Sequence, residues 1–149
     1  MLFFPALIVL AAWYVSTFWY QLMLIQGGSM EPTYHNMQLV LLDKHSKEYS
    51  KGDVAAIDCP GLSATIVKRI VAVPGDSVQI ENGSLLVNGG ISSYYADQTF
   101  DYVGMLAEKI VLSEEEYVVI GDNVLQSKDS RYEEVGIVRE NQLTGRIIE

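Results

Sequence analysis

The chain begins with a long uncharged apolar segment. From Leu2 to Ile25 it reads LFFPALIVLAAWYVSTFWYQLMLI, and the first charged residue is Glu31. This stretch exceeds the roughly 20 residues that a helix needs to cross a bilayer core. It lacks the basic start and short apolar core of a cleaved secretory leader, and a small chain offers little protein in which to bury a helix that is apolar on all sides. The pattern predicts a retained transmembrane helix within an anchor at residues 1–26.

After residue 37 apolar residues recur at every second position, which is typical of half-buried strands. The runs with this pattern read MQLVLLD, DVAAID, ATIVKRIVAV, SVQI, SLLVNG, EYVVIGD and LTGRII. Turn signals such as KGD, CPG, PGD and NGG separate them, and ENGS between two runs predicts a hairpin. Apart from the leader, only residues 104–110 have helical character. We therefore predict a mostly β fold, with an antiparallel sandwich or barrel over residues 27–149.

Composition narrows the classes of protein to which the chain can belong. It has 149 residues, 49% hydrophobic and 19% charged, which suits one folded domain. The formal net charge of −9 argues against a nucleic-acid partner, which requires a basic face. The single cysteine, Cys59, permits no internal disulfide. Since His35 and His45 lack a cluster of further ligands, we predict no metal site and no cofactor.

The segment GGSMEPTY at residues 27–34 carries a candidate nucleophile. Its two glycines let the backbone turn sharply and approach a substrate closely. An exposed Ser29 hydroxyl beside backbone N–H groups has the surroundings of a serine nucleophile next to an oxyanion site. Taken alone, the segment also fits a flexible linker followed by a turn at Pro32.

The run ATIVKRIVAV at residues 64–73 carries a candidate base. As a strand it places Lys68 in an otherwise apolar row and Arg69 on the opposite face. Burial disfavours the charged ammonium and lowers a lysine pKa from about 10.4. A neutral amine can take a proton from a serine hydroxyl. The alternative is a lysine whose amine extends to solvent at a strand edge.

The segment GDNVLQSKDSR at residues 121–131 is rich in side chains that bond to backbone groups. Asp129 and Arg131 can form an ion pair that fixes the loop. Ser127 can exchange a hydrogen bond with a nearby amine. A surface loop whose polar groups are all satisfied fits these residues equally well.

Together the segments resemble the bacterial type I signal peptidases, which are membrane-bound Ser-Lys proteases. The order is an apolar span, SMEPT, KGDV, KRIVAVPGD, GDNVLQSKDSR and RYEEVG, and it covers residues 27–136. The combination of KRxxAxPGD and GDNxxxSxDSR downstream of SMxPT is very specific. The resemblance implies a serine endopeptidase with a largely antiparallel β fold, which agrees with the period of two.

The resemblance implies a role for each matching residue. Ser29 corresponds to the nucleophile and Lys68 to the general base. Ser127 corresponds to the hydroxyl that orients the lysine amine. The other supporting residues are Asp122, Asn123, Asp129 and Arg131. The residues at positions that line the small substrate pockets of such enzymes are Met30, Ala56, Ile66 and Val67.

The resemblance also implies a substrate and a location. The family removes signal peptides from secretory preproteins by cutting after small residues, commonly Ala-x-Ala, on the outer side of the bacterial plasma membrane. We therefore expect a single-pass protein of the lipid bilayer with its catalytic domain outside. The expected reaction passes through an acyl-enzyme, and the substrate is expected to add as a strand beside the Lys68 strand.

Two features differ from some members of the family. Gly27 stands where they have a serine whose hydroxyl helps to hold the oxyanion, so the N–H of Ser29 is expected to carry more of that role. Larger members have a further β subdomain between the lysine and GDN motifs. The segment from Gly75 to Ile120 leaves little room for one.

Two alternative functions are compatible with parts of the pattern. A related Ser-Lys peptidase with a specialised substrate, such as a pilin or its own chain, uses the same dyad. Self-cleavage needs a flexible scissile segment upstream of Ser29, where we expect only the membrane span. A non-catalytic membrane-tethered β module is the other alternative, and the presence of both Ser29 and Lys68 argues against it.

Overall fold

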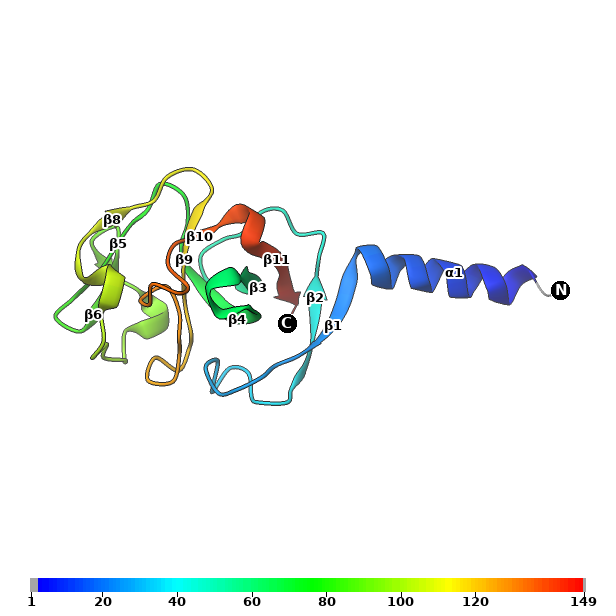
Figure 1. The fold of residues 1–149 in the computed structure, drawn as a ribbon, viewed down its shortest axis with the longest axis horizontal. Coiled ribbons are helices and arrows are strands. Elements are labelled where there is room, and N and C mark those ends of the chain that lie inside the picture. Colours follow the sequence, from blue (N-terminus) through cyan, green and yellow to red (C-terminus); the bar gives the residue numbers. More distant parts are fainter. Residues whose placement is uncertain (1–2, 149) are drawn as a thin grey trace.

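The computed structural model describes residues 3–148. Residues 1, 2 and 149, which include the start of the predicted anchor and the end of the predicted catalytic domain, lie outside the described residues. Helix α1 (Phe3–Phe18) projects from one end of a β body, and a small second sheet lies at the opposite end (Figure 1). The strands in the body confirm the prediction of a mostly β, antiparallel fold.

Within residues 3–148 the larger sheet has seven strands in the order β1-β2-β11-β3-β4-β9-β10. All neighbouring strands in it are antiparallel. Their bounds are β1 Tyr20–Leu24, β2 Leu39–Asp43, β3 Val54–Cys59, β4 Ala64–Ala72, β9 Glu116–Ile120, β10 Val138–Arg139 and β11 Leu143–Ile148. The long strand β4 lies between β3 and β9, so the run with the candidate base is an inner strand.

In the same range, the smaller sheet has four strands in the order β7-β6-β5-β8. They are β5 Ser77–Glu81, β6 Ser84–Val87, β7 Gly90–Ile91 and β8 Ile110–Val111. The predicted ENGS hairpin is confirmed, because Asn82 and Gly83 have φ of 50° and 77° between paired β5 and β6. Positive φ at both central residues matches the twist of tight hairpins and favours Asn-Gly.

Short 3₁₀ helices occupy Pro60–Leu62, Ser93–Tyr95, Gly104–Ala107 and Glu140–Gln142. The helical character predicted over residues 104–110 is therefore confined to one short turn. The chain enters strand β8 at Ile110.

Two apolar clusters flank the strand pair β3–β4. One contains Ala55 and Ile70, and the other contains Met30 and Ala56 with Val67 packed against it. Lys68 is directly opposite Ala55 in the strand register. A small side chain at that position leaves space on the apolar face for the stem of the lysine.

The uncharged leader folds as two elements rather than as one helix. Among the described residues, no helix is both long enough and apolar enough to cross a membrane, and α1 ends at Phe18 after 16 residues. The next residues form β1, which pairs with β2. The Lys44 side chain donates to the carbonyl of Thr17 at 2.8 Å, which satisfies one of the last carbonyls of the helix. The spacing of apolar residues could not indicate strand β1, because its sequence has no charged residue that would mark a face exposed to solvent.

Candidate active site

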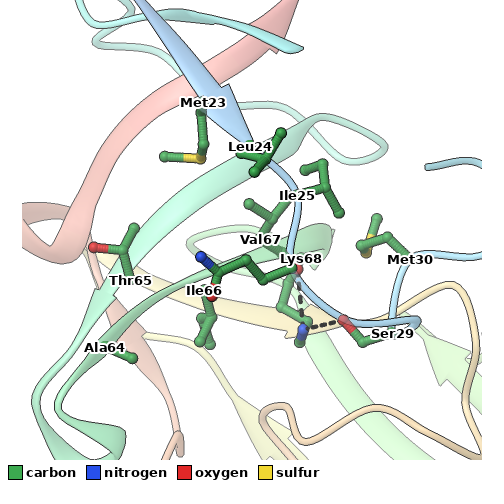
Figure 2. A pocket seen from close by; sticks show the side chains of 11 residues that line it. Met23, Leu24, Ile25, Ser29, Met30, Ala64, Thr65, Ile66, Val67 and Lys68 are labelled. Atoms are coloured by element: carbon green, nitrogen blue, oxygen red, sulfur yellow. Dashed lines mark hydrogen bonds between the residues drawn. The ribbon is translucent and has the colours of Figure 1, made fainter. Parts of the chain in front are cut away.

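The loop after β1 presents Ser29 to the amine of Lys68. Gly27 has a φ of +82°, a conformation that glycine adopts without strain, and its N–H donates to Asn36 Oδ1 at 2.9 Å. This turn carries the chain from β1 back over β4. Lys68 Nζ then donates to Ser29 Oγ at 2.7 Å (Figure 2).

Lys68 is buried, with 4% of its surface exposed. Burial lowers its pKa from 10.5 to about 8, although the nearby carboxylates of Asp129 and Asp122 act in the opposite direction. Because those carboxylates bind other partners directly, desolvation prevails. The site therefore contains an amine that can be neutral near physiological pH, in hydrogen-bond contact with a hydroxyl.

Gly121 brings Ser127 close to the backbone of Ser29. A Cβ at Gly121 would stand 2.2 Å from Ser127 Oγ and 2.6 Å from the carbonyl oxygen of Ser29, so a side chain cannot fit there. The N–H of Asn123 donates to the same carbonyl at 3.0 Å. The Ser127 hydroxyl, expected to orient Lys68, donates to Asp129 Oδ2 at 2.6 Å. The loop thus holds the backbone of the candidate nucleophile.

Asp129 and Arg131 form a buried ion pair beneath that loop. Their relative exposures are 0% and 2%, and Arg131 donates to both carboxylate oxygens at 2.8 and 2.9 Å. The same guanidinium donates to the carbonyls of Val124 and Ser127. The Gly121 N–H also donates to Asp129. Since each polar group has partners, the pair fixes the loop in one geometry.

Asp122 takes part in a second ion pair whose partner the sequence reasoning did not select. Arg69 donates to the two Asp122 oxygens at 2.8 and 2.6 Å, and the hydroxyl of Thr33 donates to the same carboxylate. The contacts connect β4, the segment after Ser29 and the loop at 121–123. The sequence pattern could have indicated that Arg69 takes part in a separate contact, because the alternation of β4 places it on the face opposite Lys68.

A cavity of about 470 Å³ leads to the Ser29–Lys68 pair. Met23, Leu24 and Ile25 line one side, and residues 64–67 of β4 line the other (Figure 2). Of the predicted pocket residues, Met30, Ile66 and Val67 line the cavity. Ala56 is instead fully buried in the cluster with Met30. Sequence reasoning missed the contribution of β1 because it assigned that segment to the anchor.

One edge of β4 is unpaired where the strand borders the cavity. Strand β9 pairs with β4 from Arg69 onward, while β3 pairs with β4 from Ala64 to Arg69. The edge of β4 before Lys68 therefore adjoins the cavity on the side away from β3. Unpaired backbone groups along such an edge can bind an extended peptide.

No group of three or more His, Cys, Asp and Glu side chains within residues 3–148 is arranged to hold a metal ion. Cys59 is buried, and its thiol contacts the carbonyl oxygen of Glu134 at 3.4 Å. The cavity is lined by the Ser29 hydroxyl and the Lys68 amine, by Gln26 and Thr65, and otherwise by apolar residues. This set can perform nucleophilic attack assisted by a base.

Comparisons with known proteins agree with this chemistry. The family described as signal peptidase, peptidase S26, matches residues 1–149. The chain is 28% identical to "Signal peptidase I" of Bacillus licheniformis in an alignment of length 148, which covers 92% of this chain and 79% of that protein. It is 31% identical to "Signal peptidase I S" of Bacillus subtilis (strain 168) over 133 residues, covering 81% and 71%. A solved signal peptidase I from Enterococcus faecalis V583 matches with a TM-score of 0.56 and 23% identity, covering 68% of this chain and 97% of that one, and shares its fold.

Proposed function

The chain belongs to the signal peptidase family, peptidase S26, and on that premise we propose that Ser29 and Lys68 are the catalytic dyad with which it removes signal peptides. Family membership confirms the resemblance drawn from the motifs, and makes the chain a serine endopeptidase whose substrates carry signal peptides. The observation that carries the dyad is the 2.7 Å hydrogen bond between a buried Lys68 and Ser29.

In the proposed reaction, neutral Lys68 takes the proton of Ser29 while Oγ attacks the carbonyl carbon of the scissile bond. In that state the hydroxyl donates to the amine, the reverse of the bond made by the charged lysine. With a pKa of about 8, about half of the amine is neutral at pH 8. A lysine at the ordinary value of 10.5 is neutral in only about one molecule in 300 at that pH.

The attack gives a tetrahedral oxyanion and then an acyl-enzyme. We propose that the N–H of Ser29 donates to the oxyanion, since Gly27 offers no hydroxyl, and each such donor typically contributes about 2.7–4 kcal/mol. Charged Lys68 then protonates the leaving amine. The amine, neutral again, activates the water that hydrolyses the acyl-enzyme, so one lysine does the work of the His-Asp pair in other serine proteases.

The substrate is proposed to bind extended in the cavity between β1 and β4. There its backbone can pair with the exposed edge of β4 before Lys68, and its side chains face Met30, Ile66 and Val67. Because these side chains are apolar, we propose that they receive small apolar residues, such as those of Ala-x-Ala, before the scissile bond.

We propose that the uncharged leader, of which α1 is the described helix, attaches the protein to the lipid bilayer as its single membrane segment, with the β body on the outer face of a bacterial plasma membrane. The helix has no charged residue, and it exposes large apolar side chains such as Phe4 and Leu7, at 78% and 66%. Exposure of this kind is favourable in lipid and costly in water. An anchor next to β1 holds the cavity near the apolar segment of a signal peptide.

The test uses the full chain in detergent and a quenched peptide with Ala-x-Ala before the scissile bond. We expect wild type to cut after the second alanine, and Ser29→Ala and Lys68→Met each to lose about 10²-fold or more in kcat/KM. Lys109→Met, at an exposed lysine, is the matched control and retains activity. Because the neutral amine is the base, the wild-type rate should rise through pH 7 and level off above about pH 8. Activity in Ser29→Ala, or a rate independent of pH below 8, contradicts the dyad.

A further inference from the structure

A second surface lies beside the chain that follows Ser29, and it shares no lining residue with the cavity between β1 and β4. It follows the chain beyond the nucleophile, and Glu31, Pro32 and Asn123 line its first part, a hollow of about 350 Å³. The loop at 121–126 forms its wall, and this loop contacts the nucleophile directly, because the N–H of Asn123 donates to the carbonyl of Ser29. The surface therefore adjoins the segment that carries Ser29.

A second hollow of about 320 Å³ extends this surface away from Ser29. The two hollows share Gln98 and Asn123 as lining residues, so they form one groove. Gln98 is fixed there by a hydrogen bond from its side-chain amide to the carbonyl of Asp122 at 3.0 Å. The far hollow is lined by Asp101 and by Leu125, whose side chain is 77% exposed. The groove thus contains a polar side chain that is hydrogen-bonded to the backbone and an exposed apolar side chain.

The charges that line the groove have one sign. Glu31 lies in the near hollow and Asp101 in the far hollow. Asp122 also lines the near hollow, but its charge is paired with Arg69. Since neither hollow is lined by lysine or arginine, a peptide in the groove meets a negative potential from end to end.

A substrate cut in the middle of its chain must occupy both sides of the nucleophile. The cavity between β1 and β4 can take the residues before the scissile bond, so the residues after it leave across the other side. Four extended residues span about 13 Å, and the two hollows adjoin at Gln98 and Asn123. We infer that this groove binds the first residues of the mature chain, with Glu31 and Asp101 making basic residues preferable to acidic ones.

The inference rests on the proposed function and adds a specificity to it. Glu31, in the hollow next to the Ser29 segment, is assigned to the first two residues after the scissile bond. Asp101, in the farther hollow, is assigned to the third and fourth. The cleaved product also gains a positive α-amino group in the near hollow, so the same charge attracts the new amino terminus.

Five peptides test the groove. They share Ala-x-Ala before the scissile bond. One has serine at all four positions after it, and in the other four a pair of lysines or a pair of glutamates replaces either the first two or the last two of these serines. The kcat/KM values of wild type, Glu31→Gln, Asp101→Asn and the double variant are measured at low and high salt. The matched control is Glu114→Gln, an exposed carboxylate before the start of β9, at the end of that strand remote from the loop at 121–126. A ratio of lysine to glutamate peptide within one variant cancels any loss of folded enzyme.

We expect wild type to prefer the lysine peptides by about two- to fivefold at low salt, with the preference shrinking as salt screens the charges. Glu31→Gln should reduce the ratio for the first pair, Asp101→Asn for the second pair, and the double variant should bring both near one. Glu114→Gln should keep the wild-type ratios. Equal cleavage of lysine and glutamate peptides by wild type, or the same loss of preference in Glu114→Gln, overturns the inference while cleavage of the serine peptide still supports the proposed function. If wild type does not cut the serine peptide, the proposed function fails, and the inference fails with it.

Discussion

Lys68 and Arg69 are consecutive cations on β4, yet their side chains have opposite surroundings. Arg69 forms two hydrogen bonds with the carboxylate of Asp122, and these bonds hold its pKa above the ordinary value. Lys68 is more deeply buried, donates to a hydroxyl and a carbonyl, and has its pKa lowered to about 8. One side chain is kept charged and the other is able to lose its proton.

The difference shows how two ion pairs can surround Lys68, the proposed base, while its pKa stays low. Asp122 and Asp129 are the carboxylates that raise the pKa of Lys68 at a distance. Both are bound at close range by Arg69 and Arg131. The guanidinium groups therefore offset most of the negative charge of the two carboxylates. Burial then has the larger effect on the pKa of Lys68. The same pairs fix the loop that contacts Ser29.

The largest effect on activity is expected when Lys68, the proposed base, is replaced by arginine, the residue that follows it on β4. Lys68→Arg keeps a cation beside Ser29, but an arginine does not lose its proton near neutral pH. We expect kcat/KM on an Ala-x-Ala peptide to fall by about 10²–10⁴-fold. The thermal midpoint of the variant and of Ser29→Ala reports folding. A Lys68→Arg enzyme within about tenfold of wild type is incompatible with a lysine general base.

The framework can be broken in its most buried pair. Asp129→Ala leaves the guanidinium of Arg131, which is 2% exposed, without its carboxylate. We expect a loss of about 3–5 kcal/mol in the free energy of unfolding, measured by urea denaturation. Glu134→Gln is the matched control, because its pair with Lys128 is 45% exposed on both sides, and its midpoint should stay near wild type. Similar losses in the two variants would show that burial does not set the strength of the pair.

The cost of burying Lys68 should appear in the pH dependence of stability. Its folded pKa of about 8 lies below the ordinary 10.5, so between these values the unfolded chain binds more protons. Wild-type stability therefore rises with pH across this window, by about 3 kcal/mol from this group. Lys68→Met should remove that rise and be more stable than wild type at pH 7, whereas Lys109→Met should retain it. Parallel curves for wild type and Lys68→Met would refute a depressed lysine pKa.

The smallest effect is expected when Arg69 is replaced by lysine. Arg69→Lys retains the charge but loses the two-point contact with Asp122, for which we expect about 1.5 kcal/mol in unfolding free energy. The loop at 121–123 should also hold Ser29 less firmly, lowering kcat/KM several-fold. Asp122→Asn and the double variant complete a cycle that isolates the pair. Arg139→Lys, at a 64% exposed side chain, is the control. Full additivity in the cycle would mean that the pair has no coupling.

Several parts of the fold were predictable because their signals are local. The seven period-two runs all contain strands of the structure, and ENGS forms the turn of a hairpin. Strand β1 was not predictable, since an uncharged apolar segment fits a helix or a strand equally well until β2 pairs with it. The cavity residues Met23 and Leu24 were missed for the same reason.

Some features of the candidate site were also predictable from the sequence, and others were not. Alternation along β4 was sufficient to place Lys68 in an apolar row and Arg69 on the other face. Other contacts depend on how the chain folds. Two of them join segments that are apart in the chain, namely the pair of Arg69 with Asp122 and the hydrogen bond from Asn123 to Ser29. The direction of the Ser127 hydroxyl depends on the conformation of its loop. Spacing in a sequence carries no information on such distances.

By itself, the sequence determined the β character of the body, the antiparallel hairpin at ENGS, and the family to which the spacing of its motifs belongs. It also placed a lysine in the apolar row of one strand. The tertiary structure decided which carboxylate each cation meets and which edges border the cavity. The physical reason is range: periodicity and turn chemistry act over a few residues, whereas a lowered pKa and a 2.7 Å contact between Ser29 and Lys68 require strands distant in the chain to pack together.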